Sequence, residues 1–121
     1  MKHNQLDDVK KNMILDLKKK ARESKQDFYL ALSRALDTSS RRAISVNIYT
    51  LEKFAKKNPS KTFLIAGSLL GFGELESKVN VYAFKASKNA LEKIKAKKGT
   101  IKDFSELLKA KIESKDVMIL K

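Results

Sequence analysis

The fold of this chain is decided by residues 62–84, which read TFLIAGSLLGFGELESKVNVYAF. Residues 62–66 are an apolar run of strand length, and residues 79–84 are a second run with apolar side chains at successive positions. A strand that is apolar on both faces is typical of the middle of a sheet. Between the two runs, residues 67–73 carry three glycines, which predict a flexible and turn-rich connection.

Short strands and helices alternate on both sides of this stretch. Upstream, the segment 43–48 predicts a strand, and the apolar residues at 51, 54 and 55 predict a short helix. That helix ends before Pro59, because the residue before a proline is pushed out of the α region. The downstream elements are a helix capped by Ser87 and ended near Gly99, a brief strand at 100–102, a helix at 104–112 capped by Asp103, and a buried terminal strand at 117–120.

The N-terminal part is predicted to be helical. Two apolar faces recur at steps of three and four residues, and residues 37–40 end the second helix. We therefore predict an α/β fold in which a helical N-terminal segment precedes a small domain of alternating short strands and helices. We expect one domain over 1–121, with a basic helical segment at 1–40 and an α/β core at 41–121. The two apolar faces are formed by Leu6, Val9, Met13, Leu17 and Ala21, and by Phe28, Ala31, Leu32 and Ala35 within 26–36.

The charge of the chain predicts a polyanionic partner. Lysine and arginine number 27 against 14 acidic residues, so the net charge is +13 at pH 7. Such an excess repels itself in an isolated chain, and nucleic acid is the commonest partner that relieves it. Residues 1–61 carry +8 and residues 62–121 carry +5, so the charge is not confined to a tail. A heat-adapted surface is the alternative, but it predicts that glutamate rises together with lysine.

The residues that enzymes use are scarce. There is no cysteine, and the one histidine, His3, lies at the terminus. The glycine spacing G-x-x-x-G-x-G at 67–73 differs from the known nucleotide-binding motifs. A tight connection, or a close approach of the backbone to an RNA phosphate, explains it better. We therefore expect no enzyme, cofactor, metal ion or small-molecule substrate. The absence of a long apolar run predicts no membrane partner and a cytoplasmic location.

The basic residues best suited to bind RNA lie in the first 42 residues, which contain all four arginines. Arginine can hold a phosphate through two parallel hydrogen bonds. Lys18–Lys20, Arg22 and Lys25 form a dense patch at the end of the first helix. Arg41 and Arg42 share a loop, where paired guanidinium groups repel each other unless an anion lies near. Three phenylalanines fall on apolar helical faces, so base stacking is not the expected mode of binding.

Three segments together resemble a known family. They read RRAISVNI at 41–48, GSLLGFGEL at 67–75 and VNVYAFKAS at 79–87. This combination is similar to the large-subunit ribosomal protein eighteen family of archaea and eukaryotes, which is related to bacterial ribosomal protein fifteen. Ser68 and Tyr49 depart from the family pattern, which usually has a lysine and a helix-capping serine there.

The resemblance implies an irregular ββα superhelix embedded in large-subunit ribosomal RNA, beside neighbouring large-subunit ribosomal proteins. Its expected role is to bind and stabilise folded RNA through phosphate contacts, at the ribosome. Two alternatives stay open: a free-standing nucleic-acid-binding protein outside the ribosome, and a small enzyme that binds a nucleotide on the glycine segment. The residues that we predict to contact RNA are Lys18, Lys19, Lys20, Arg22, Lys25, Arg34, Arg41, Arg42, Lys61, Gly71, Gly73 and Lys78.

Overall fold

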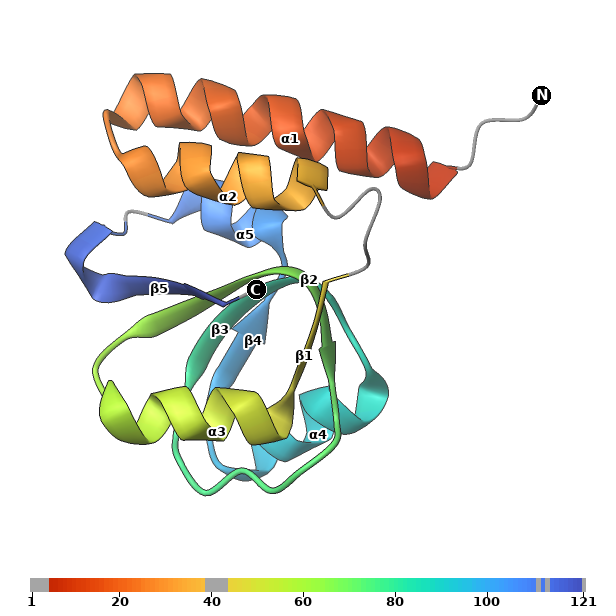
Figure 1. The fold of residues 1–121 in the computed structure, drawn as a ribbon, viewed down its shortest axis with the longest axis vertical. Helices are drawn as coiled ribbons and strands as arrows, with labels where there is room; N and C mark the ends of the chain where they lie inside the picture. Colours follow the sequence, from red (N-terminus) through yellow and green to blue (C-terminus); the bar gives the residue numbers. More distant parts are fainter. Residues whose placement is uncertain (1–4, 39–43, 111, 113, 121) are drawn as a thin grey trace.

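A parallel β-sheet lies at the centre of the molecule, between two groups of helices (Figure 1). The computed structural model describes residues 5–38, 44–110, 112 and 114–120. The helices are α1 (Gln5–Ser24), α2 (Asp27–Thr38), α3 (Ile48–Lys57), α4 (Lys88–Ala96) and α5 (Phe104–Lys109), with a 3₁₀ turn at Ser114–Asp116. The strands are β1 (Ser45–Asn47), β2 (Thr62–Leu70), β3 (Asn80–Ala86), β4 (Thr100–Lys102) and β5 (Val117–Leu120). These elements confirm the predicted α/β class and its helical N-terminal segment.

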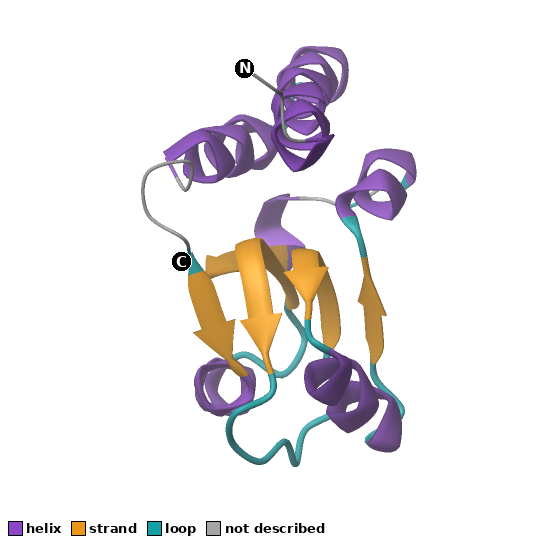
Figure 2. Ribbon diagram, turned by 90° about the vertical axis from the view of Figure 1, so that its right-hand side faces the viewer, coloured by secondary structure: helices purple, strands orange, loops and turns teal. Residues whose placement is uncertain are grey.

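Strand β2 organises the sheet because both of its edges are paired. All pairs are parallel, and the strand order is β1-β2-β3-β4 (Figure 2). One edge of β2 pairs with β3. The other edge is shared: Thr62–Ile65 pair with β5, and Ser68–Leu70 pair with β1. The sequence prediction that 79–84 is a central strand is confirmed, because β3 lies between β2 and β4.

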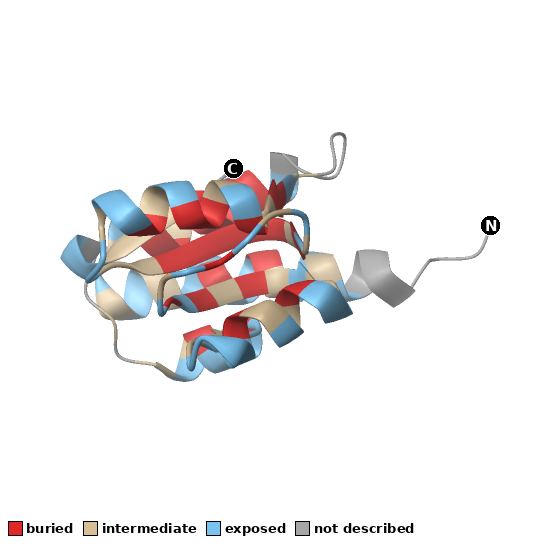
Figure 3. Cartoon of the chain, turned by 90° about the horizontal axis from the view of Figure 1, so that it is seen from below, coloured by how far each residue is buried: buried red, intermediate tan, exposed pale blue. Residues whose placement is uncertain are grey.

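The two faces of the sheet bury two separate apolar clusters. Phe63, Ile65 and Val81 point to the face that α3 and α4 cover. Leu64 and Ala66 point to the opposite face, which α1, α2 and α5 cover. Neighbouring side chains of a strand alternate between the faces, so an uninterrupted apolar run fills both cores. Figure 3 shows the buried residues concentrated in the sheet and along the inner sides of the helices.

Local capping signals are confirmed where the sequence predicted them. The Ser87 hydroxyl accepts a hydrogen bond from the Ala90 N–H at 3.2 Å at the start of α4. The Asp103 carboxylate accepts one from the Glu106 N–H at 3.1 Å at the start of α5. Such side chains satisfy N–H groups that have no partner within the first turn of a helix.

Several predicted details are wrong. Residues 67–70 are not part of a turn but continue β2, with a register shift between Ile65 and Ser68. Gly67 is needed there because a Cβ atom would collide with the carbonyl oxygen of Ile44, and that carbonyl accepts a hydrogen bond from the Ser68 N–H at 2.9 Å. Helix α5 ends at Lys109 rather than at residue 112, and β5 is half-buried at three of its four positions.

The apolar faces of the N-terminal helices are also partly corrected. Val9 is exposed, and Ile14 is buried beside Leu17. In α2, Ala31 is exposed, whereas Tyr29 and Leu36 are buried with the predicted residues. The predicted boundary near residue 40 lies outside the described residues, so the division into 1–40 and 41–121 stays a prediction.

Candidate nucleic-acid interface

The outer side of α1 presents basic side chains on a firmly packed helix. Ile14 and Leu17 bury the inner side of α1 in the core, while Lys18, Lys19 and Arg22 are exposed. Lys20 is half-buried. Because the helix has 3.6 residues per turn, an inner apolar stripe places the intervening residues on the solvent side. The packing therefore holds these basic groups at defined positions.

The turn between α1 and α2 extends this basic surface. Lys25 is exposed and has a positive φ of 58°, the left-handed conformation that often ends a helix. The Ser24 hydroxyl donates to the Lys20 carbonyl at 2.7 Å and accepts from the Gln26 N–H at 3.3 Å. These bonds fix the turn, which lies at one end of the helical hairpin (Figure 1). The structure thus brings Lys18, Lys19, Arg22 and Lys25 to one region of the surface.

The other predicted basic residues lie apart from that region or cannot be placed. Arg34 is exposed on α2, and Lys78 is exposed in the segment before β3. Lys61 is half-buried, and its ammonium group donates to the Lys115 carbonyl, which ties the start of β2 to the turn before β5. Arg41 and Arg42 lie outside the described residues. RNA contact remains a prediction for all of them.

The glycine segment packs against the first turns of two helices. Gly71 lies against Asn89 at the start of α4, and Gly73 lies against Tyr49 at the start of α3. Gly73 has a positive φ of 105°, and a Cβ atom there would lie 2.6 Å from the Cβ of Tyr49. The Lys93 ammonium donates to the carbonyls of Gly71 and Gly73 at 2.6 and 2.5 Å. Internal packing therefore accounts for these glycines, and their contact with RNA stays a prediction.

Glu52 holds the segment that follows the glycines. Its side chain is buried, and its carboxylate accepts hydrogen bonds from the Ser77 hydroxyl at 2.5 Å and from the N–H groups of Glu76 and Ser77 at 3.2 and 3.4 Å. Burial raises the pKa of Glu52, but these bonds and the nearby charge of Lys56 outweigh it and hold the pKa below its ordinary value. The carboxylate thus stays ionised and fixes the connection to β3.

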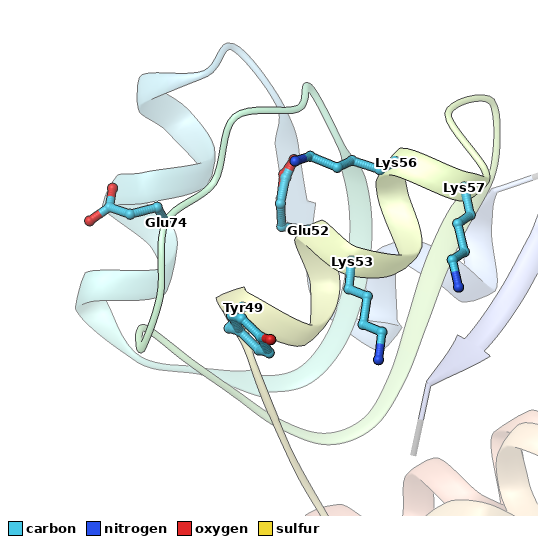
Figure 4. Close-up of a pocket in the computed structure, with 6 residues that line it drawn as sticks. All are labelled: Tyr49, Glu52, Lys53, Lys56, Lys57 and Glu74. Carbon is cyan, nitrogen blue, oxygen red and sulfur yellow. The ribbon is translucent and has the colours of Figure 1, made fainter.

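A groove of about 330 Å³ runs along the outer side of α3 (Figure 4). Tyr49, Lys53 and Lys57 project to the same side of this helix, since they are spaced four residues apart. Glu52 and Lys56 project to another side, and Lys56 lies 3.8 Å from the carboxylate of Glu76. Glu74 lines the groove at the end farthest from Lys57.

Sequence reasoning missed two exposed aromatic residues at this place. Tyr49 is 63% exposed and Phe72 is 74% exposed. Both were overlooked because attention went to the phenylalanines on apolar helical faces. Two sequence signals could have identified them: Phe72 stands between two glycines, and Tyr49 shares its helical spacing with Lys53 and Lys57.

Two further classes of site are not seen in the described part of the chain. There, no three His, Cys, Asp or Glu side chains gather where they could hold a metal ion. No helix among the same residues is long and apolar enough to cross a membrane.

Comparison with known proteins gives consistent matches. The family model described as the ribosomal proteins 50S-L15 and 50S-L18e with their 60S counterpart matches residues 45–102, which extend from β1 to β4. Large ribosomal subunit protein eL18 of Methanoregula boonei is 31% identical over 110 residues, covering 91% of this chain and 89% of the relative. The eL18 proteins of Sulfurisphaera tokodaii and Thermoplasma volcanium are 30% and 28% identical, covering 82% and 91% of this chain and 82% and 88% of the relatives.

Proposed function

This chain belongs to the family of ribosomal proteins 50S-L15 and 50S-L18e and their 60S counterpart, and on that premise we propose that it is a structural component of the large ribosomal subunit. Its role is to bind and stabilise folded ribosomal RNA through phosphate contacts, beside neighbouring ribosomal proteins. The observation that carries the proposal is the similarity to eL18 over nine-tenths of the chain. The net charge of +13 supports it independently, because a polyanion is the partner that such a surface attracts.

The α1–α2 hairpin supplies the best-defined phosphate-binding groups. Lys18, Lys19, Arg22 and Lys25 are exposed, and the opposite side of α1 is buried against the rest of the fold. A preformed set of cations loses little freedom when it binds phosphates. Arginine adds two parallel donors that match phosphate geometry. Phosphate contacts of this kind position a protein on folded RNA without reading its sequence.

Cofractionation with large ribosomal subunits is the direct test of this function. We expect the protein to sediment with the large subunit in a sucrose gradient at low salt and to be released as salt is raised. Recovery only in the soluble fraction at low salt would contradict the proposal. Preferential binding of duplex DNA over ribosomal RNA would instead favour a free-standing nucleic-acid-binding protein.

A pair of double variants tests the position of the interface. Lys18→Ala with Arg22→Ala removes two basic groups from α1, and Lys95→Ala with Lys97→Ala removes two exposed lysines near the end of α4 as a matched control. If both α1 groups contact phosphates, the first variant lowers the slope of log affinity against log salt by about 1.4–1.8. We expect the control to keep the wild-type slope. An unchanged slope in the first variant would place the interface elsewhere.

A further inference from the structure

Two exposed aromatic side chains originate from the same small area of the surface. The Tyr49 N–H donates to the Phe72 carbonyl at 2.9 Å, so the start of α3 and the glycine segment are in direct contact. Five large hydrophobic residues are exposed in the described part of the chain, and three of them, Tyr49, Leu70 and Phe72, lie in or beside this contact. Exposed apolar groups that gather in one place mark an interaction site more often than scattered ones do.

The protein holds the Phe72 backbone in place rather than leaving it on a loose loop. The carbonyls of Gly71 and Gly73, on either side of Phe72, both accept hydrogen bonds from the Lys93 ammonium. Behind them, Glu52 binds the N–H groups of Glu76 and Ser77. Little backbone freedom is therefore left to lose when a partner covers the ring, which favours binding.

The charges around the aromatic pair indicate the chemistry of the partner. Lys53 and Lys57 are exposed on the same side of α3 as Tyr49 (Figure 4). Glu52 is committed to its hydrogen bonds, and Lys56 lies beside Glu76. Glu74 lines the far end of the groove, so a phosphate is best accommodated at the Lys53–Lys57 end. Aromatic rings next to a row of lysines are the combination that binds unpaired nucleotides.

We propose that Tyr49 and Phe72 form a stacking site for an unpaired nucleotide of RNA, whose neighbouring phosphates bind Lys53 and Lys57. The inference rests on the proposed function for the identity of the RNA, and it adds a contact that reads single-stranded structure to the phosphate contacts of α1. A base in a continuous duplex offers no free face for stacking, so the site selects a loop, a bulge or a flipped-out nucleotide.

Ring-specific variants of the full chain test the site through its affinity for transcribed large-subunit ribosomal RNA. Phe72→Ala is expected to lower the affinity between about 5-fold and 150-fold, the range for losing one base–aromatic stack. Phe72→Leu keeps apolar bulk without a π-face and is expected to lose nearly as much. Tyr49→Phe keeps the ring and should bind like the wild type, whereas Tyr49→Ala should not. None of these variants is expected to change the salt slope, since no cation is removed.

Controls separate the failure of this inference from the failure of the proposed function. Val9→Ala truncates another exposed hydrophobic residue, on α1, and is expected to bind normally. Circular dichroism checks that each variant is folded. If the wild type binds RNA in a salt-dependent way and Phe72→Ala binds equally well, the stacking site is wrong and the proposed function stands. If Phe72→Leu binds like the wild type while Phe72→Ala does not, the occupant is an apolar surface such as a protein, which also overturns the inference. A wild type that binds no ribosomal RNA overturns both proposals.

Ultraviolet cross-linking adds a readout that does not depend on affinity. Rings stacked on bases cross-link directly to RNA, and mass spectrometry identifies the residues. We expect cross-links at Tyr49 or Phe72 in the complex with ribosomal RNA. Cross-links confined to other parts of the chain would contradict the proposed site.

Discussion

Replacing Glu52 with alanine is expected to destabilise the fold by about 2–4 kcal/mol. The carboxylate is buried and accepts three hydrogen bonds, of which the one from the Ser77 hydroxyl, at 2.5 Å, is the shortest. A hydrogen bond to a charged group contributes roughly 1.5–3 kcal/mol. The three bonds share one carboxylate and the bond from the Ser77 N–H is long, so their contributions do not simply add.

Urea unfolding monitored by circular dichroism measures this loss. The matched control is Glu74→Ala, which removes an exposed carboxylate from the same groove and is expected to change the stability by less than about 0.5 kcal/mol. In a thermal scan, the Glu52→Ala protein should melt lower by about 3–6 °C for each kcal/mol lost. Equal stabilities of the two variants would refute the argument that Glu52 holds the segment before β3.

The same residue predicts a dependence on pH. The folded-state pKa of Glu52 lies below its unfolded value, which is near 4.5. Its contribution is therefore fully present above pH 4.5 and is lost as the pH falls through the folded-state pKa. The stability gap between the wild type and Glu52→Ala should narrow as the pH is lowered through this window. A gap that stays constant, or widens, would show that the carboxylate charge is not what stabilises the contact.

Three further substitutions probe neighbouring contacts. Gly73→Ala is expected to cost about 2 kcal/mol or more in urea unfolding, because it combines a positive φ with a collision at Tyr49; an unchanged midpoint would contradict this. Ser87→Ala removes the cap of α4 and should cost about 1 kcal/mol, whereas Ser87→Asp should retain the cap and the stability. Lys93→Met removes the donor to two glycine carbonyls, so hydrogen exchange should become faster at Phe72 and Gly73 and stay unchanged in β4.

Local signals made much of the fold predictable. The caps at Ser87 and Asp103 were correct because each depends only on a side chain and a backbone N–H three residues later. The central position of β3 was correct because apolar side chains at successive positions require cover on both faces. The solvent exposure of Lys18, Lys19 and Arg22 likewise follows from helical periodicity.

Contacts between distant segments could not be predicted. Gly67 was interpreted as a turn residue, yet it lies inside β2 because the Ile44 carbonyl approaches where a side chain would be. Phe72 and Tyr49 were left without a role because their proximity depends on the glycine segment crossing the start of α3. A glycine needed for a close approach and a glycine needed for a turn look identical in a single sequence.

The shared edge of β2 has a consequence for the synthesis of this protein. Residues 62–65 pair with β5, whose residues lie more than fifty positions further along the chain. A nascent chain that ends anywhere between these segments has already made β2 but leaves half of one edge without a partner. An unpaired edge flanked by Phe63, Leu64 and Ile65 is a template for pairing with another chain. The last strand therefore also closes a site of aggregation, and truncated chains that lack 117–120 should be recovered as aggregates rather than as folded protein.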